Sequence, residues 1–363
     1  MTRIEKRRTR VRLYCGDCLE VLPTLEPGSV QCCVSSPPYW CLRDYGTAVW
    51  EGGDEMCDHK NETRHQSQGT NSARAGRSNV EEQRNENFKS VCHKCGARRI
   101  DQQIGLEETP EQYVAKLVEV FREVRRVLRD DGTLWLNLGD SYTGSSNSGG
   151  KGKQDTACRL AGMPKKVCDG LKPKDLVGMP WRVAFALQAD GWYLRQDIIW
   201  HKPNPMPESV TDRCTKSHEY LFLLAKSQKY HCDMAAIKEP AAYAGQMRGG
   251  STKRYEQNAA GMDCKVYDTR NRRDVWTIPT EPYLEAHFAT FPTALVDPCI
   301  MAGCPAGGLV LDPFMGSGTV GEVAMKHGCR FVGIELNPEY LELAKRRLAN
   351  ATPCLFAAAE VTG

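Results

Sequence analysis

The sequence predicts an α/β fold built on a doubly wound, mostly parallel sheet. Short apolar segments bounded by turn residues alternate with segments of helical periodicity, which is the pattern of such sheets. A strand-like run also leads directly into a glycine-rich turn at 309–321. The length of 363 residues corresponds to about two domains, or to one large domain with insertions. We therefore expect one large sheet that insertions interrupt.

The expected elements follow from these patterns in chain order. Strands are predicted at 30–34, 133–138, 194–200, 308–311 and 330–335. Residues 111–128 carry an apolar stripe of helical spacing, Pro180 opens a helix that ends before Gly191, and Asn337-Pro338 begins the last helix. The polar stretches 60–90, 144–170 and 206–275 do not fit this alternation and are predicted to be loops or irregular segments.

Composition and charge restrict the class of protein. No apolar run approaches the roughly 18 residues of a spanning helix, and no apolar stretch follows the basic start, so we expect a soluble cytoplasmic protein. The 17 cysteines are then predicted to be reduced thiols, some of them on a metal. The net charge of +3 is uninformative, but basic residues gather at 1–12 and 241–274. Such clusters suit phosphate contacts or a solvated face.

The glycine-rich turn reads Asp312-Pro-Phe-Met-Gly316-Ser-Gly318 and predicts a nucleotide-type cofactor site. Glycine lets the backbone approach a ligand at the carboxyl end of a strand, and the next strand ends in Glu335, where it can bind ribose hydroxyls. The same turn could serve a nicotinamide or flavin. However, only 45 residues follow Gly318, too few for the remaining strands of a conventional dinucleotide fold. The rest of the sheet must precede it, as in a circular permutation.

The segment Ser35-Ser36-Pro37-Pro38-Tyr39 follows the strand at 30–34 and suits a base amine. Prolines donate no hydrogen bonds, so their carbonyls face outward as acceptors. Ser36 and the Pro37 carbonyl can orient an exocyclic amine, while Tyr39 stacks on a base taken out of the helix. The alternative is a proline turn with an aromatic lid.

These two motifs, in this order, resemble the beta-class, circularly permuted amino-methyltransferases of DNA, which use S-adenosylmethionine. The resemblance covers most of the chain and extends to 192–205, to Ser217-His218-Glu219-Tyr220 and to 287–292. It implies a Rossmann-like methyltransferase sheet, double-stranded DNA as partner, base flipping, and a monomer or homodimer.

The resemblance also implies roles for individual residues. The catalytic loop would be Ser36, Pro37, Pro38 and Tyr39, here called the amine loop. The methionine side of the cofactor would be lined by Asp312, Phe314, Gly316, Ser317, Gly318 and Thr319, with Glu335 on the ribose and Phe291, Pro292 and Thr293 closing the pocket. Asp17 resembles the adenine contact of the family, although Gly-Asp is also a common turn dipeptide.

The first residue of the amine loop separates substrates within the family. Ser-Pro-Pro-Tyr resembles the enzymes that methylate the cytosine N4 amine, and Asp-Pro-Pro-Tyr those that methylate the adenine N6 amine. We therefore expect an N4-cytosine methyltransferase, with N6-adenine as the alternative. Carbon-5 methylation is disfavoured because it needs a cysteine nucleophile, and neither Cys299 nor Cys354 lies in the base loop. A non-catalytic, zinc-bearing DNA-binding protein is the alternative from another class, against which both intact loops argue.

Two cysteine-containing segments predict a structural zinc site. Cys57-Asp-His59 and Cys92-His-Lys-Cys95-Gly flank the polar stretch 60–90. Cys-x-x-Cys-Gly is a common zinc knuckle, because its tight turn brings two thiolates within reach of one ion. We predict Cys57, His59, Cys92 and Cys95 as ligands, with His65 or His93 as rivals and ordinary thiols on a loop as the alternative.

The predicted organisation is a catalytic domain at 1–56, 100–205 and 285–363, a zinc-binding insertion at 57–99 and a target-recognition region at 206–284. The last part, 285–363, would bind the cofactor. Candidate DNA contacts are the basic residues near the amine loop and in the recognition region, although surface ion pairs are an equal interpretation. They are Arg43, Lys202, Arg248, Arg254, Arg270, Arg272 and Arg273. Restriction protection and phage self-modification both remain open as contexts.

Overall fold

The computed structural model describes residues 11–42, 45–59, 91–143, 170–241, 268–281, 291–351 and 360–362. The chain forms two compact units. The first, here called the sheet unit, comprises Met1–Ser36, Val118–Gly139 and Ala184–Gly363. The second, here called the hairpin unit, comprises Pro37–Leu117 and Asp140–Val183. Among the described residues, no helix is both long enough and apolar enough to cross a lipid bilayer.

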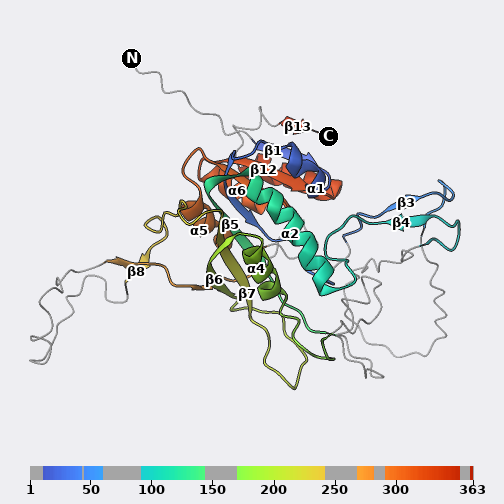
Figure 1. Cartoon of the computed structure of the whole chain (residues 1–363), viewed down its shortest axis with the longest axis horizontal. Helices are drawn as coiled ribbons and strands as arrows, with labels where there is room; N and C mark the ends of the chain where they lie inside the picture. The colour runs from blue at the N-terminus through green and yellow to red at the C-terminus, as the bar shows by residue number, and fades with distance from the viewer. Residues whose placement is uncertain are drawn as a thin grey trace, which may run out of the picture. The chain divides into compact units, whose positions relative to one another are not determined.

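A nine-stranded sheet is the centre of the sheet unit, with the strand order β10-β6-β7-β5-β2-β11-β12-β1-β13. Figure 1 labels six of its strands, β1, β5, β6, β7, β12 and β13. Strand β7 runs antiparallel to both of its neighbours, and the other strand pairs of this sheet are parallel among the described residues. The predicted α/β class with a mostly parallel sheet is therefore confirmed. Its strands are β1 (Val11–Cys15), β2 (Val30–Ser35), β5 (Leu128–Leu138), β6 (Tyr193–His201), β7 (His218–Ala225), β10 (Val275–Thr277), β11 (Leu309–Asp312), β12 (Arg330–Glu335) and β13 (Glu360–Thr362).

Three of the helices, at 110–127, 179–189 and 338–351, form where the sequence predicts them. The described helices are α1 (Cys18–Val21), α2 (Pro110–Val127), α4 (Met179–Ala189), α5 (Thr293–Gly303), α6 (Thr319–Lys326) and α7 (Pro338–Ala351), with a short 3-10 helix η1 (Leu22–Thr24). Asn337 begins α7 as expected, because its Oδ1 accepts a hydrogen bond from the Glu339 amide at 2.8 Å. The predicted loop 60–90 and nearly all of 144–170 lie outside the described residues.

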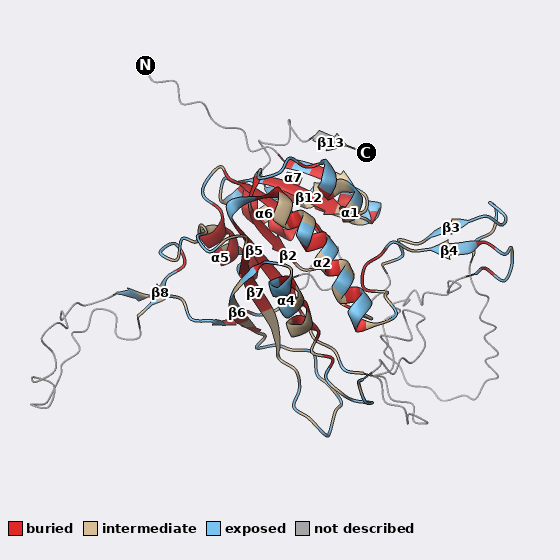
Figure 2. Cartoon of the chain, in the orientation of Figure 1, coloured by how far each residue is buried: buried red, intermediate tan, exposed pale blue. Residues whose placement is uncertain are grey.

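The core of the sheet unit joins the strands to helices α5, α6 and α7. Val310 of β11 and Phe331 of β12 are fully buried, and they belong to one apolar cluster with Cys299 of α5, Val320 of α6 and Ala344 of α7. Figure 2 shows this burial along the central strands. Because β1, β2, β11 and β12 are parallel, their carboxyl ends meet at one edge of the sheet.

The sheet includes part of the predicted recognition region 206–284. Strand β7 lies between β5 and β6, and its residues from Leu221 to Ala225 are buried. Strand β10 extends the same sheet beside β6. Leu221 to Ala225 of β7 and Trp276 of β10 are buried, and polar flanking segments conceal this pattern in the sequence. The remainder includes a two-stranded pair, β8 (Glu239–Pro240) and β9 (Thr269–Arg270).

A small antiparallel pair stands in the hairpin unit. Strand β3 (Val49–Glu51) pairs with β4 (Arg98–Ile100), with Trp50 opposite Arg99. Strand β4 spans the predicted boundary 99/100 of the insertion, and its partner β3 lies before the boundary 56/57. The paired strands thus flank the two cysteine segments, and the bounds of the insertion stay a prediction.

Candidate active site

The glycine-rich loop and the amine loop begin at the ends of neighbouring strands. Strand β11 ends at Asp312 and pairs with β2, which ends at Ser35. The Ser35 hydroxyl donates a hydrogen bond of 2.6 Å to Asp312 Oδ1, and both residues are 1% exposed. In the sheet, β11 lies between β12 and β2, and β5 lies on the far side of β2. After β11 the chain continues into β12, away from β2. Ligands of open α/β sheets bind at such a point, so this edge is the candidate active site.

Positive φ angles shape the glycine-rich loop. Gly316 has φ 53° and Gly318 has φ 84°, both in the left-handed region that glycine enters without strain. Gly318 is the N-cap of α6, and a Cβ there would lie 3.1 Å from Ala344 Cβ. The Gly316 amide donates a hydrogen bond of 2.8 Å to Glu335 Oε2 at the end of β12. The loop therefore presents backbone rather than side chains at the strand ends.

Asp312 has one carboxylate oxygen without a partner. Its Oδ1 accepts hydrogen bonds from Ser35 and, at 3.1 Å, from the Phe314 amide, but its Oδ2 is buried with no hydrogen-bond partner among the described residues. Burial raises the pKa of Asp312 to about 7. An unsatisfied buried acceptor costs about 1–3 kcal/mol. A ligand that carries an ammonium group would satisfy it.

Glu335 and Asp17 lie on adjacent strand ends. The two carboxylate oxygens of Glu335 accept backbone hydrogen bonds from Asn337, at 2.9 Å, and Gly316, and burial raises the pKa of Glu335. Each oxygen has a second lone pair for a hydroxyl group. The Gly16 amide bonds the Glu335 carbonyl at 2.9 Å, and Asp17 caps α1 by accepting from the Leu19 amide at 2.8 Å. The structure thus shows the turn role of Asp17, and its adenine contact stays a prediction.

The hydroxyls of Ser317 and Thr319 face helix α7. Arg347 Nη1 donates hydrogen bonds to both, at 3.2 Å and 2.8 Å, and Arg347 also pairs with Glu322. Both hydroxyl residues are 3% exposed. Their side chains therefore fix the loop to α7, and their contact with the cofactor stays a prediction.

The other predicted pocket residues lie on elements of the same unit. The Phe314 ring packs edge-on against Phe121 of α2, with 6.5 Å between ring centroids. Pro292 is the N-cap of α5, Thr293 is its first residue, and Phe291 packs against the core cluster. Their closing of a pocket stays a prediction.

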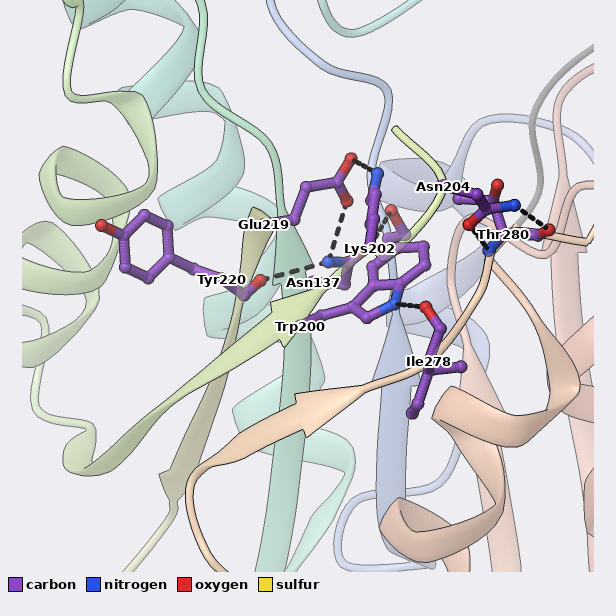
Figure 3. A network of polar contacts seen from close by, with 9 residues as sticks. Asn137, Trp200, Lys202, Asn204, Glu219, Tyr220, Ile278 and Thr280 are labelled. Carbon is purple, nitrogen blue, oxygen red and sulfur yellow. Dashed lines mark hydrogen bonds and ion pairs between the residues drawn. The ribbon is translucent and has the colours of Figure 1, made fainter. Parts of the chain in front are cut away.

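Ser36 belongs to a polar network that the sequence patterns did not predict, and Figure 3 shows the part of it formed by Asn137, Glu219, Tyr220 and Lys202. The Ser36 hydroxyl donates a hydrogen bond of 3.2 Å to Asn137 Oδ1, and Asn137 Nδ2 donates to Glu219 Oε2 at 3.2 Å and to the Tyr220 carbonyl at 3.1 Å. Glu219 forms an ion pair with Lys202. The sequence signal that could have revealed this network is Asn137, a polar residue inside the apolar run 133–138. A buried polar side chain needs hydrogen-bond partners.

The rest of the amine loop is anchored within the hairpin unit. The Pro38 carbonyl accepts a hydrogen bond of 2.8 Å from the hydroxyl of Tyr113, a fully buried residue. Burial raises the pKa of Tyr113 well above its ordinary value, so the hydroxyl keeps its proton. Pro37 is buried, and Tyr39 is half-buried. The loop is therefore held by fixed contacts rather than by the prolines alone.

The predicted DNA contacts that the structure describes have partners within the protein. Arg270 and Arg273 each donate to Glu239 Oε1, at 2.8 Å and 2.7 Å, and the Arg272 guanidinium lies 4.5 Å from the Trp276 ring centroid. Lys202 lies over Trp200, 4.2 Å from its ring centroid, as well as pairing with Glu219. Arg43, Arg248 and Arg254 lie outside the described residues. DNA contact by all seven stays a prediction.

The predicted zinc ligands come together in the hairpin unit. The ligand atoms of Cys57, His59, Cys92 and Cys95 all lie within 4.8 Å of one another. The rival His93 is not in this cluster, and His65 lies outside the described residues.

Comparison with known proteins gives one consistent result. The DNA methylase family matches residues 30–346. The chain is 45% identical over 338 residues to the type II methyltransferase M.Cfr9I of Citrobacter freundii, covering 93% of this chain and 87% of that protein. It is 43% identical over 349 residues to the type II methyltransferase M.SmaI of Serratia marcescens, covering 95% and 93%.

Two solved structures share the fold. One is a Thermus thermophilus protein assigned as a DNA modification methylase and complexed with S-adenosyl-L-methionine, with a TM-score of 0.53, 22% identity and 97% coverage of each chain. The other is the PvuII DNA methyltransferase (cytosine-N4-specific), with a TM-score of 0.55, 14% identity, and coverage of 99% of this chain and 98% of that one.

Proposed function

The chain belongs to the DNA methylase family and is an S-adenosylmethionine-dependent DNA methyltransferase, and from this premise we propose that it methylates the N4 amine of cytosine in double-stranded DNA. The observation that carries the choice of base is Ser36 as the first residue of the amine loop, hydrogen-bonded to Asn137. The type II names of its relatives support a place in a restriction–modification system.

The Ser36–Asn137 hydrogen bond orients an acceptor for the amine. Because the serine proton goes to Asn137 Oδ1, the lone pairs of the serine oxygen are directed elsewhere and can accept an amine hydrogen. Asn137 is itself fixed by Glu219 and the Tyr220 carbonyl, so the acceptor is preorganised. With its hydrogens held, the amine lone pair faces the incoming methyl group. A cytosine paired in a duplex must first be flipped out, and Tyr39 supplies a ring for it to stack on.

The residues at the strand ends fit the cofactor. S-adenosylmethionine supplies a methyl group on a positively charged sulfur, and its methionine part carries an ammonium group. The unpartnered Oδ2 of Asp312 suits that ammonium, and the remaining lone pairs of Glu335 suit ribose hydroxyls. Gly316 leaves room for the ligand, because nothing lies within 4 Å of the position of a Cβ there.

Direct transfer is favoured over a covalent intermediate on the enzyme. Cys33 precedes the amine loop most closely on β2, but it is fully buried and burial raises the pKa of its thiol well above the ordinary value. A protonated, buried thiol is not a nucleophile. The chemistry then depends on positioning and electrostatics, and it needs no strong base.

Identification of the methylated nucleoside tests the proposal. Duplex DNA would be treated with the protein and S-adenosylmethionine that carries a deuterated methyl group, digested to nucleosides and analysed by mass spectrometry against standards. We expect labelled N4-methyldeoxycytidine. Labelled N6-methyldeoxyadenosine would overturn the choice of base and support the adenine alternative. Tight DNA binding with no labelled nucleoside would support a non-catalytic protein.

A further inference from the structure

We infer that Cys57, His59, Cys92 and Cys95 bind one structural Zn²⁺. A series of contacts between two chain segments, here called the ladder, leads from this cluster back to the amine loop, and the ion would hold the end of the ladder that is distant from that loop. This cluster lies in the hairpin unit and takes no part in the proposed chemistry. The inference stands whichever base the enzyme methylates.

The ligand atoms have the spacing of a tetrahedral zinc site. Cys57 Sγ lies 3.7 Å from Cys92 Sγ, and Cys95 Sγ lies 3.6 Å from His59 Nδ1. Ligands at zinc distances of about 2.3 Å for sulfur and 2.0 Å for nitrogen stand about 3.5–3.8 Å apart at tetrahedral angles. A disulfide would need its sulfurs about 2.05 Å apart. Three thiols and one imidazole are donors that select zinc over harder cations.

The local backbone is shaped around the cluster. The Gly96 amide donates to the Cys92 carbonyl at 2.7 Å, and Gly96 has φ 79°, as the tight turn of a zinc knuckle requires. Gly53 has φ 76°, and a Cβ there would lie 2.8 Å from Cys95 Sγ. Both glycines therefore stand where a side chain would strain the turn or press on a ligand.

The apolar core around the cluster is too small to hold it. Only Cys92 and Ala97 form its buried centre among the described residues, with Trp50, Cys57 and Cys95 packed partly buried against them. The Trp50 ring stacks on His59 at 4.5 Å between centroids. Cores this small require a metal or a disulfide as a staple. The free energy of metal binding would then be the free energy that folds this segment.

Contacts between two chain segments connect the cluster to the amine loop. Residues 41–42 and 45–51 run beside 98–105, and their contacts occur in regular order. From the amine loop outward they are Cys41 N to Gly105 O at 2.8 Å, Tyr45 N to Gln103 Oε1 at 2.7 Å, Thr47 Oγ1 to Asp101 Oδ1 at 3.1 Å, and the β3–β4 pairs from Val49↔Ile100 to Glu51↔Arg98. The metal would close the open end of this ladder. Its loss would loosen the ladder from that end.

Metal analysis of the purified full-length protein tests the site itself. We expect about one zinc per chain, and a thiolate-to-metal absorption band when Co²⁺ replaces zinc. Cys95→Ser and His59→Ala should each reduce bound zinc severalfold, whereas Cys214→Ser, at an exposed thiol in the sheet unit, should leave it unchanged. Protein without zinc, or equal zinc in all of these variants, would overturn the inference.

Hydrogen exchange after chelation tests the ladder without a substitution. Removing the metal should raise exchange at the Cys41 and Tyr45 amides at least tenfold, while the amides of β11 and β12 keep their protection. S-adenosylmethionine binding should stay within twofold of the untreated protein. Unchanged exchange at Cys41 and Tyr45 after the metal has left would contradict the stapling role.

Discussion

The sheet unit and the hairpin unit are stabilised in different ways. In the sheet unit, strands β2, β5, β11 and β12 share a large buried core with α5, α6 and α7. Around the cysteine cluster of the hairpin unit, the described residues form a buried core of only Cys92 and Ala97, with a few half-buried neighbours. Hydrophobic burial stabilises the first region, whereas we propose that the second depends on the binding of a metal by its cysteine and histidine side chains.

This difference divides the proposed functional residues into two groups, one in each unit. Asp312, Glu335 and Ser36 stand at the ends of buried strands, so the core fixes them. Pro38 to Cys41 are fixed by contacts inside the hairpin unit. Changes in the sheet unit should therefore act on cofactor binding and global stability, and changes at the cluster on the local order of the hairpin.

Gly316→Val should have the largest effect. A β-branched residue at φ 53° strains the loop and places its side chain where the cofactor is expected to lie. We expect the dissociation constant of S-adenosylmethionine, measured by calorimetry, to rise at least about 100-fold. Gly28→Val is the matched control, because Gly28 also has positive φ (66°) and open space but precedes β2. Equal losses in both variants would mean that strain, rather than the site, is responsible.

Gly303→Ala should destabilise the sheet unit. A Cβ there would lie 2.7 Å from Trp135 Nε1, 2.8 Å from Cys32 Sγ and 2.9 Å from Thr133 Oγ1. Overpacking of this kind costs about 1–3 kcal/mol in the free energy of unfolding, measured by denaturant titration. Gly53→Ala should instead weaken zinc binding and leave the midpoint of the main unfolding transition unchanged. If Gly53→Ala shifted the main transition as much as Gly303→Ala does, the two regions would not be stabilised separately.

Asp312 should make cofactor binding depend on pH. Burial raises its pKa to about 7, so the ligand-free carboxyl is mostly protonated at pH 5.5, whereas an ammonium group prefers it ionised. The affinity for S-adenosylmethionine should therefore increase about tenfold from pH 5.5 to 7. Folding stability should change in the opposite sense, because the folded state retains this proton and loses that contribution as pH rises towards 7. In Asp312→Asn both dependences should be absent, and a flat wild-type binding profile would contradict the assignment.

Lys94→Ala should have the smallest effect. Lys94 pairs with Asp58 at 3.1 Å beside the cluster, but the side chains are 33% and 57% exposed. Exposed ion pairs contribute about 0–1 kcal/mol, so zinc affinity in competition with a chelator should change less than about fivefold. A loss as large as that of Cys95→Ser would show that charge, rather than ligation, holds the segment.

Local patterns made most of the fold and the zinc cluster predictable. Apolar runs bounded by turns gave the central strands, and the Cys-x-x-Cys-Gly spacing identified ligands that the structure brings together. What escaped prediction depends on contacts between distant segments. Strand β7 was placed in the recognition region because its flanks are polar, and the network from Ser36 through Asn137 to Glu219 joins three strand ends. The pairing of Arg270 and Arg273 with Glu239 is equally nonlocal.

Single-turnover methyl transfer by Ser36→Ala tests the central claim most directly. Cofactor binding should be measured on the same sample, with Ser29→Ala as the control, because Ser29 is a half-buried serine before β2 whose hydroxyl donates only to the nearby Glu26 carbonyl. Losing the acceptor should lower the transfer rate at least about 100-fold while the dissociation constant of S-adenosylmethionine stays within twofold. A fully active Ser36→Ala enzyme would contradict the assignment of the amine loop.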